Sequence, residues 1–277
     1  MKIYDLHVHA CIDRPYDRDA MLAALDEAGI FGACVFSERP PEVSRQRGIS
    51  FEARLEQLAM LTEGAEERLF PVIWAHPYER GISKKLLRAK EAGVVAVKVM
   101  PCNFYIEEKK SMRMMREIAA LELPIIFHSG ILWDNGASGK YTRPVNYEPL
   151  LEVENLRFSM GHCSWPWVDE CIAMYGKFNW ARHFYGRTAE MFFDITPGTP
   201  AIYRRDLLTK LHKVGYPVKD NILFGTDHVA NSYDSKRARA MIEQDNAIYD
   251  ELGISEETRA AIYRDNLARF LGKELSL

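Results

Sequence analysis

The chain lacks the features that mark several large classes of protein. Its five cysteines are widely spaced and form no CxxC pair, so a disulfide framework is not indicated and a reducing compartment fits best. No run of about 18 or more apolar residues occurs, and no apolar segment follows a basic start at Met1. Lys and Arg are scattered, and the net charge is −3, so there is no basic stripe for nucleic acid. We therefore expect a cytoplasmic protein without nucleic-acid or membrane partners.

Two common catalytic signatures are also missing. The chain contains neither a G-x-S-x-G nucleophile elbow nor a phosphate-binding P-loop, which disfavours covalent serine chemistry and nucleotide hydrolysis. What is present is ordinary for a globular protein, with 47% hydrophobic and 27% charged residues. The length of 277 residues suits a single eight-stranded α/β barrel.

Short apolar segments alternate with helical patterns along the chain. Strands are predicted at 3–9, 31–37, 69–76, 94–100, 124–129, 157–163, 191–196 and 221–227. Helices are predicted at 18–28, 50–64, 83–92, 108–122, 147–152, 165–177, 201–214 and 235–252, with a last helix at 256–271. Strict alternation favours parallel strands joined by crossover helices. The predicted fold class is therefore α/β: a single (β/α)8 TIM barrel over residues 1–277 with an extra C-terminal helix.

Ionisable side chains stand at the ends of the predicted strands. His7 and His9 end the first strand, His128 the fifth, His162 the sixth and Asp227 the eighth. Side chains alternate along a strand, so the two histidines of the first strand point the same way. The carboxyl ends of barrel strands form the face on which active sites are assembled. Histidines with a carboxylate suit zinc, and also manganese, iron or nickel, so we predict a site for one or two divalent ions.

Lys98 stands inside an apolar strand, between Val97 and Val99. A buried ammonium group is costly unless a partner neutralises it. One option is a carbamate formed with CO₂, which would bridge two metals. The other is a plain lysine that pairs with a carboxylate or with substrate at the barrel mouth. The residues alone leave both options open.

The set of strand ends resembles the amidohydrolase superfamily of metal-dependent hydrolases: HxH in the first strand, Lys in the fourth, His in the fifth and sixth, and Asp in the eighth. The segments DNLARFLG at 265–272, KVMP at 98–101 and FHSG at 127–130 resemble its amidohydrolase 2 branch more narrowly. The resemblance covers essentially the whole chain. That branch lacks the β-sandwich of urease and dihydroorotase relatives and includes lactonases, amide and ester hydrolases, and decarboxylases of small carboxylated rings.

The resemblance implies a ligand set and a choice of functions. His7, His9 and Asp227 would bind a metal together with His128, and His162 would bind a second metal or act as an acid/base. One metal is favoured over two, because lactonases and decarboxylases of the branch commonly work that way. The leading function is hydrolysis of a C–O or C–N bond in a lactone, ester or amide, with Asp227 as the catalytic proton carrier. The alternatives are a non-oxidative decarboxylase, with His162 handling the proton, and a non-catalytic metal-binding barrel.

Several further residues are candidates for binding a small-molecule substrate. They are Arg143, Tyr141, His76, His183, Arg187 and Trp165. An arginine presents paired donors that suit a carboxylate, so a carboxylated substrate is expected, although a solvated surface also explains the basic residues. The sequence is compatible with a monomer and with a homo-oligomer.

Overall fold

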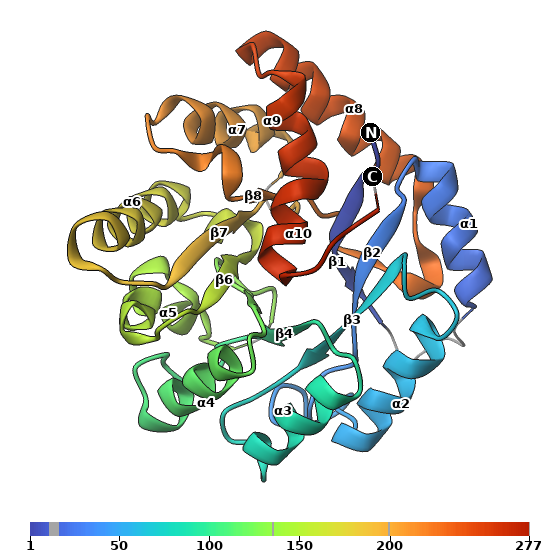
Figure 1. The fold of residues 1–277 in the computed structure, drawn as a ribbon, viewed down its shortest axis with the longest axis vertical. Helices are drawn as coiled ribbons and strands as arrows, with labels where there is room; N and C mark the ends of the chain where they lie inside the picture. Colours follow the sequence, from blue (N-terminus) through green and yellow to red (C-terminus); the bar gives the residue numbers. More distant parts are fainter. Residues whose placement is uncertain (11–16, 135, 199, 277) are drawn as a thin grey trace.

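The computed structural model describes residues 1–10, 17–134, 136–198 and 200–276. Within these ranges nine strands form one sheet in the order β8-β7-β6-β5-β4-β3-β2-β1-β9. All neighbouring strands pair in parallel. Figure 1 shows the strands curling about a common centre with the helices around them. The predicted α/β barrel fold is confirmed.

The described elements follow the predicted alternation. The strands are β1 (Tyr4–His9), β2 (Gly32–Phe36), β3 (Leu69–Trp74), β4 (Ala96–Val99), β5 (Ile125–Phe127), β6 (Arg157–Met160), β7 (Glu190–Asp194), β8 (Ile222–Leu223) and β9 (His228–Val229). The α-helices are α1 (Arg18–Ala28), α2 (Phe51–Thr62), α3 (Ile82–Glu91), α4 (Lys109–Ala120), α5 (Gly139–Thr142), α6 (Val168–Tyr185), α7 (Arg204–Lys213), α8 (Ser235–Leu252), α9 (Glu256–Ala260) and α10 (Asn266–Leu271). Short 3₁₀ segments are η1 (Pro144–Glu152), η2 (Gly161–Ser164), η3 (Ala201–Tyr203), η4 (Val218–Asp220) and η5 (Ala230–Ser232), and η6 (Ala261–Asp265) is a π-helical turn that joins α9 to α10.

Several predicted elements have different ends in the structure. The segment predicted as a helix at 147–152 belongs to the 3₁₀ segment η1, and the strand predicted at 157–163 ends at Met160. The strand expected at 221–227 is regular only in β8, and the ring closes through a 2.9 Å hydrogen bond from the N–H of Leu6 to the carbonyl of Phe224. The helix expected at 165–177 begins at Val168 and continues to Tyr185. Gly176 lies within this helix and leaves room for Tyr216, whose Cζ would lie 2.5 Å from an added Cβ.

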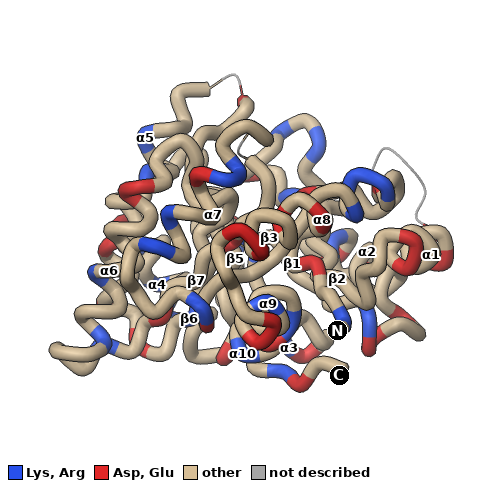
Figure 2. The backbone as a smooth tube through the Cα atoms, turned by 90° about the horizontal axis from the view of Figure 1, so that it is seen from above, with Lys and Arg blue, Asp and Glu red and all other residues tan. Residues whose placement is uncertain are grey.

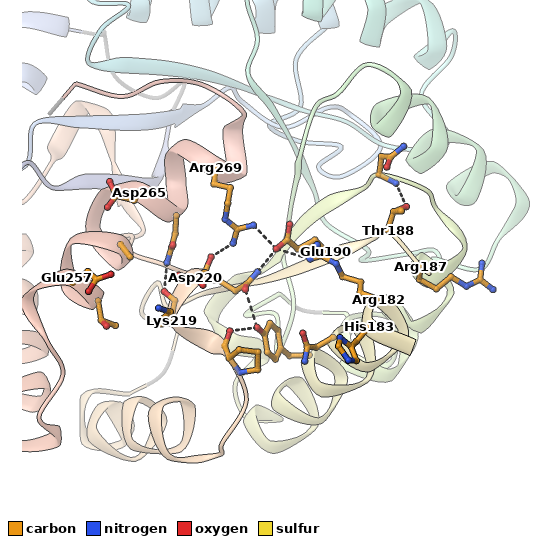
Figure 3. Close-up of a pocket in the computed structure, with 18 residues that line it drawn as sticks. Arg182, His183, Arg187, Thr188, Glu190, Lys219, Asp220, Glu257, Asp265 and Arg269 are labelled. Atoms are coloured by element: carbon orange, nitrogen blue, oxygen red, sulfur yellow. Dashed lines mark hydrogen bonds and ion pairs between the residues drawn. The ribbon is translucent and has the colours of Figure 1, made fainter. Parts of the chain in front are cut away.

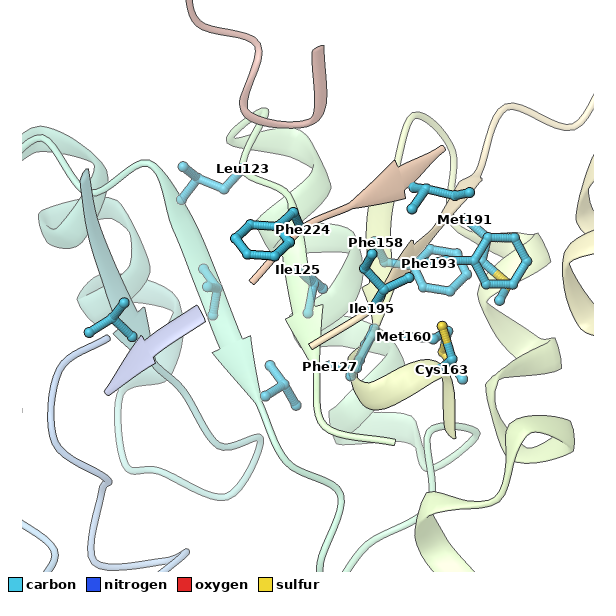
Figure 4. Close-up of a cluster of buried hydrophobic side chains, with 14 of the residues drawn as sticks. Leu123, Ile125, Phe127, Phe158, Met160, Cys163, Met191, Phe193, Ile195 and Phe224 are labelled. Atoms are coloured by element: carbon cyan, nitrogen blue, oxygen red, sulfur yellow. The ribbon is translucent and has the colours of Figure 1, made fainter. Parts of the chain in front are cut away.

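The core has an outer and an inner layer. Phe127, Phe158 and Phe193 are fully buried in the outer layer, where the strands face the helices (Figure 4). Inside the ring, the side chains of Tyr4, Phe36, Phe70, Trp74, Ile126 and Phe192 form a second cluster with Leu267 and Phe270 of α10. The last helix therefore closes the amino-terminal end of the barrel and leaves the carboxyl ends of the strands for a site.

The outside of the molecule carries charges of both signs. Figure 2 shows Lys and Arg segments interspersed with Asp and Glu segments. Many of them form ion pairs, such as Arg113 with Glu117 on α4 at 2.8 Å. Among the described residues, no helix is both long enough and apolar enough to span a bilayer.

Candidate metal centre

Three potential metal ligands meet at the carboxyl end of β1. The Oδ1 atom of Asp227 lies 3.3 Å from Nε2 of His9 and 3.6 Å from Nε2 of His7. One ligand atom from each of the three residues lies within 4.8 Å of the others. This spacing suits an ion held at about 2.0–2.2 Å from each ligand. Two imidazoles and one carboxylate form a donor set suited to a first-row divalent metal.

An irregular register in β1 helps to aim these ligands. Between Asp5 and Val8 the strand advances three residues while β2 advances two, from Ala33 to Val35. A bulge of this kind leaves an extra residue unpaired and re-aims its side chain. The N–H of His7 donates to Oδ1 of Asp5 at 2.9 Å instead. The side chain of Asp5, two residues away, thus accepts the backbone N–H of His7 that the bulge leaves unpaired.

Asp194, the last residue of β7, orients the first histidine. Its Oδ2 lies 2.8 Å from Nδ1 of His7, and its Oδ1 accepts the N–H of Thr196 at 2.9 Å. Because Nδ1 faces this buried carboxylate, Nε2 carries the lone pair available for a metal. Burial, followed by the charge of Lys98, holds the pKa of His7 well below its ordinary value, which keeps the ring neutral. The sequence analysis missed Asp194, although an acid at the end of FFD obeys the same strand-end rule.

Asp227 occupies an uncommon backbone conformation. Its φ is +60°, in the left-handed region that Asp tolerates better than most residues. Burial raises the pKa of this carboxyl, but the hydrogen bond with His9 opposes burial, and the pKa is held below its ordinary range. The carboxylate is therefore ionised at neutral pH, as a metal ligand must be.

Lys98 of β4 lies beside the three-residue group and is 1% exposed. Its Nζ is 3.2 Å from Nε2 of His7, and it lies 5.1 Å from the ring centroid of Phe36. Burial lowers the pKa of Lys98 to about 8, against the opposing effect of Asp194 and Asp227. A lysine that loses its proton this readily suits a carbamate and a plain lysine alike.

The two remaining strand-end histidines form an adjacent pair. The ring centroids of His128 and His162 are 5.0 Å apart, and His162 is 5.3 Å from His7. His128 Nε2 faces the carbonyl of Ile131 at 3.3 Å, and His162 Nδ1 faces that of Thr196 at 3.4 Å. The structure thus brings all five predicted strand-end residues together, as a compact group of three with a pair beside it.

The backbone after β6 explains where His162 lies. Three successive residues, His162, Cys163 and Ser164, have φ values of 58°, 44° and 58°. This left-handed turn ends the strand at Met160 and places the imidazole against Gly198, where an added Cβ would lie 2.7 Å from the ring Cγ. A glycine is therefore required for this close approach.

A cavity of about 580 Å³ lies next to the three-residue group. His9, Asp227, Lys98, His128 and His162 line it, together with Trp74, Trp133, Trp165, Arg39 and Arg47. Trp165 was predicted as a substrate-binding residue, and it stacks on Trp133 with ring centroids 6.3 Å apart. Arg39 and Arg47 were not predicted as cavity residues. They follow β2, and this strand has no candidate metal ligand at its end to draw attention to the segment.

Arg39 is an exposed cation in this lining. Its guanidinium lies 5.6 Å from the ring centroid of Trp74. Among the described residues, no carboxylate is placed to form an ion pair with it. Its charge contributes to lowering the pKa of His9 and of Lys98, so its field reaches the three-residue group.

The arginine and tyrosine predicted after β5 lie outside this cavity. Arg143 donates to Glu170, with 2.8 Å between Nη2 and Oε1, and is exposed. Tyr141 packs on Tyr105 with ring centroids 4.7 Å apart. Arg143 therefore forms an ion pair on the outer surface, and the structure places neither residue in the lining of the metal cavity.

His183 and Arg187 lie at the other end of the barrel. They line a cavity of about 930 Å³ built around Glu190, which pairs with Arg182 at 2.8 Å and Arg269 at 2.6 Å (Figure 3). Glu190 begins β7, whereas Asp194 of the metal centre ends it. Helix α6 runs back along the barrel, so its last turn cannot reach the carboxyl face. We correct the expectation that these residues contact substrate in the metal cavity.

His76, which follows β3, lines a separate cavity with Tyr78 and Asn103. It is buried, and its Nε2 lies 2.9 Å from Oδ1 of Asn103. The imidazole of His76 therefore contacts Asn103 and does not line the metal cavity. His228 packs edge-on against Tyr233 with ring centroids 4.8 Å apart, which fits its position on the opposite side of the chain from Asp227.

Known proteins resemble this chain in family and in fold. Residues 4–273 match the family described as Amidohydrolase. A probable 2-pyrone-4,6-dicarboxylic acid hydrolase from Acinetobacter baumannii, solved with citric acid bound, has a TM-score of 0.65 and 12% identity, over 98% of this chain and 100% of that one. A 2,6-dihydroxybenzoate decarboxylase has a TM-score of 0.68 and 14% identity, over 98% and 99% of the two chains. A 5-carboxyvanillate decarboxylase from Sphingomonas paucimobilis has a TM-score of 0.67 and 10% identity, over 99% of both chains.

At these identities the solved structures establish the fold. A comparison with curated proteins found no match. The family match, however, spans all of the barrel strands and both faces of the ring. The protein therefore belongs to the amidohydrolase family.

Proposed function

We propose that the protein is a metal-dependent hydrolase that cleaves a C–O or C–N bond in a small carboxylated lactone, ester or amide. The observation that carries this proposal is the group His7, His9 and Asp227, which adjoins a cavity that also presents Arg39. The solved hydrolase from Acinetobacter baumannii has a similar fold and is named for a dicarboxylic acid, which supports this class of substrate.

The donor set fits one divalent ion, with zinc as the first expectation and manganese, iron or nickel as alternatives. His7 offers Nε2 because Asp194 holds Nδ1, and Asp227 is ionised. When bound, such a metal would lower the pKa of a coordinated water toward neutrality and polarise the substrate carbonyl. His128 lines the adjoining cavity and is the candidate for a further ligand.

Asp227 is suited to carry the proton of the reaction. A carboxylate that binds a metal through one oxygen keeps the other for a hydrogen bond, so it can accept a proton from the attacking water. It can then deliver that proton to the leaving oxygen or nitrogen. Asp194 holds the ring of His7 in a fixed orientation during this transfer, while burial keeps the ring neutral.

The cavity lining supports a planar, anionic substrate. Arg39 offers donors for a carboxylate, and Trp165 offers a flat apolar surface for a ring. The volume of about 580 Å³ suits a small molecule. Lys98 adds a second group, cationic below its pKa of about 8, between the metal ligands and these residues.

The direct test is a substrate screen on protein reconstituted with zinc or manganese. Carboxylated lactones, esters and amides should be hydrolysed, and the matching uncarboxylated compounds should be poorer substrates. Asp227→Asn should retain metal but lose turnover. Stoichiometric metal without turnover of any compound in the panel would favour a non-catalytic metal-binding barrel instead.

A non-oxidative decarboxylase is the second candidate, and His162 favours it. This imidazole lines the cavity but lies outside the three-residue group, so it is available to transfer a proton to carbon. The two solved decarboxylases of similar fold act on carboxylated aromatic rings according to their names. Release of CO₂ from a carboxylated aromatic, with loss of that release in His162→Asn, would select this function over hydrolysis.

A further inference from the structure

We propose that Asp5 is a positioning residue for the metal centre, because its carboxylate ties together the two backbone segments that carry His7 and Asp227. The inference rests on the proposed metal binding. It goes beyond that proposal by giving a role to a side chain that bonds the backbone beside the ligands.

Asp5 is fully buried and all of its acceptor capacity is used. Its Oδ1 accepts the N–H of His7 and the N–H of Thr226, each at 2.9 Å. Its Oδ2 accepts the hydroxyl of Thr226 and the hydroxyl of Tyr233, the latter at 2.9 Å. A carboxylate has about four lone-pair sites, so these donors saturate it.

The two N–H groups on Oδ1 come from positions that the sheet does not hold. That of His7 lies in the bulge of β1, where the register against β2 shifts. That of Thr226 lies beyond the end of β8 and directly before Asp227, whose φ is +60°. One oxygen atom therefore replaces the strand ladder for both segments, which are far apart in the sequence.

The backbone at Gly225 packs closely against Oδ1 of Asp5 and has little room to move. A Cβ added at Gly225 would lie 3.0 Å from Cβ of His7 and 3.3 Å from Oδ1 of Asp5. The segment that leads to Asp227 thus lies directly against both residues of β1. Without the carboxylate, the segment has no comparable acceptor at this point, and the separation of the ligands His7 and Asp227 should widen or fluctuate.

A buried carboxylate with four donors also stabilises the fold, so thermal stability alone does not separate the two roles. Metal affinity of the folded protein does. The test compares the wild type with Asp5→Ala and Asp5→Asn, well below their melting temperatures. Zinc affinity is measured by competition with a chromophoric chelator, and the absorption spectrum of the cobalt-substituted protein reports coordination geometry.

Asp5→Ala should lower the zinc affinity by about 10–100-fold and change the cobalt spectrum. Asp5→Asn keeps an oxygen for the two N–H groups and should lose less, although at least about 3-fold. Leu208→Ala is the matched control, because this fully buried α7 side chain stabilises the fold away from the ligands. It should lower the melting temperature and leave zinc affinity unchanged.

Wild-type zinc affinity and spectrum in the Asp5 variants would overturn the inference, and so would an equal loss of affinity in Leu208→Ala. If Asp5→Ala does not fold, Asp5→Asn decides the question by the same criterion. A wild-type protein that binds no zinc or manganese tightly would instead overturn the proposed function, so the two failures are distinguishable.

Discussion

Nδ1 of His7 lies 2.8 Å from Oδ2 of Asp194, and both side chains are almost completely buried. The pair joins β1 to β7 across the inside of the ring, since the strands are not neighbours in the sheet. The carboxylate fixes which ring nitrogen carries the proton and which faces Asp227. The tautomer of one proposed ligand is therefore set by a strand that contributes no ligand of its own.

Replacing Asp194 by Ala should lower zinc affinity by about 10–100-fold, because the imidazole of His7 loses its fixed tautomer and orientation. Competition with a chelator measures the effect. Thr196→Val is a milder change: it removes a hydroxyl that lies next to Asp194 Oδ1 and 3.4 Å from Nδ1 of His7, and it leaves the Oδ2 contact with His7 in place. Equal affinities in the wild type and Asp194→Ala would show that β7 does not orient the ligand.

Asp227→Asn tests the proton-carrying role. The amide keeps the shape of the side chain but is a poor base, so turnover should fall by about 10²–10⁴-fold while some metal remains bound. Metal content by elemental analysis and turnover are measured on the same sample. His9→Ala is the contrasting variant, because it should lose both metal and activity. A metal-loaded Asp227→Asn enzyme with the wild-type rate would exclude this role.

Arg39→Met should weaken the binding of carboxylated ligands by roughly tenfold, since a hydrogen bond to a charged group contributes about 1.5–3 kcal/mol. Calorimetric titration with benzoate-type carboxylates and their neutral amides separates charge recognition from ring stacking. Arg143→Met provides the control, because this arginine pairs with Glu170 outside the cavity. A uniform loss for acids and amides would argue against a carboxylate contact.

Gly225→Ala should damage the metal centre through packing. An added Cβ would lie 2.7 Å from Oγ1 of Thr196 and 3.0 Å from Cβ of His7, so one of these must move. Overpacking of this kind costs about 1–3 kcal/mol of stability, and zinc affinity should fall as well. Gly139→Ala should be neutral in both measurements, because its nearest neighbours would be 3.5 Å away. Unchanged zinc binding in Gly225→Ala would show that the site tolerates this displacement.

The buried imidazole of His212 should make the free energy of unfolding depend on pH in the acid range. Burial, and then the charge of Lys213, lower its pKa from 6.5 to about 4 in the folded protein. Below pH 6.5 the unfolded chain binds the proton more readily, so stability is lost as the pH falls from about 6.5 to about 4. The loss should reach up to about 3 kcal/mol. In His212→Leu, urea unfolding at pH 7 and pH 4.5 should show a smaller difference, and an unchanged difference would assign the sensitivity to other groups.

Many elements could be predicted from the sequence because their signals are local. Helix α1 begins where Asp17 accepts the N–H of Ala20 and ends at Gly29 in the left-handed region, as the sequence indicates. The same reasoning failed at the ends of the sixth helix, which was predicted at 165–177 but runs from Val168 to Tyr185. It failed again after β8, where a contact with β1 rather than local preference shapes the chain.

The approach of His7, His9, His128, His162 and Asp227 to one another follows from the alternation of strands and helices. Parallel strands all present their carboxyl ends to the same face, so residues at those ends must meet once the ring forms. A local pattern can mark Asp194 as a strand-end residue, but it does not name the distant partners of Asp194 and Asp5. Asp194 and Asp5 reach their partners across 187 and 221 residues of sequence, and only the closed ring brings them together.

The choice of basic residue in the cavity was also decided by tertiary structure. Composition and motif favoured Arg143 and Arg187, but the first meets Glu170 and the second is carried by α6 to the opposite end of the barrel. Arg39 lines the metal cavity instead. Periodicity along the chain determines which segments become strands and where they end. Where a long arginine side chain points depends on the charged groups that the folded loops place beside it, as Glu170 does for Arg143.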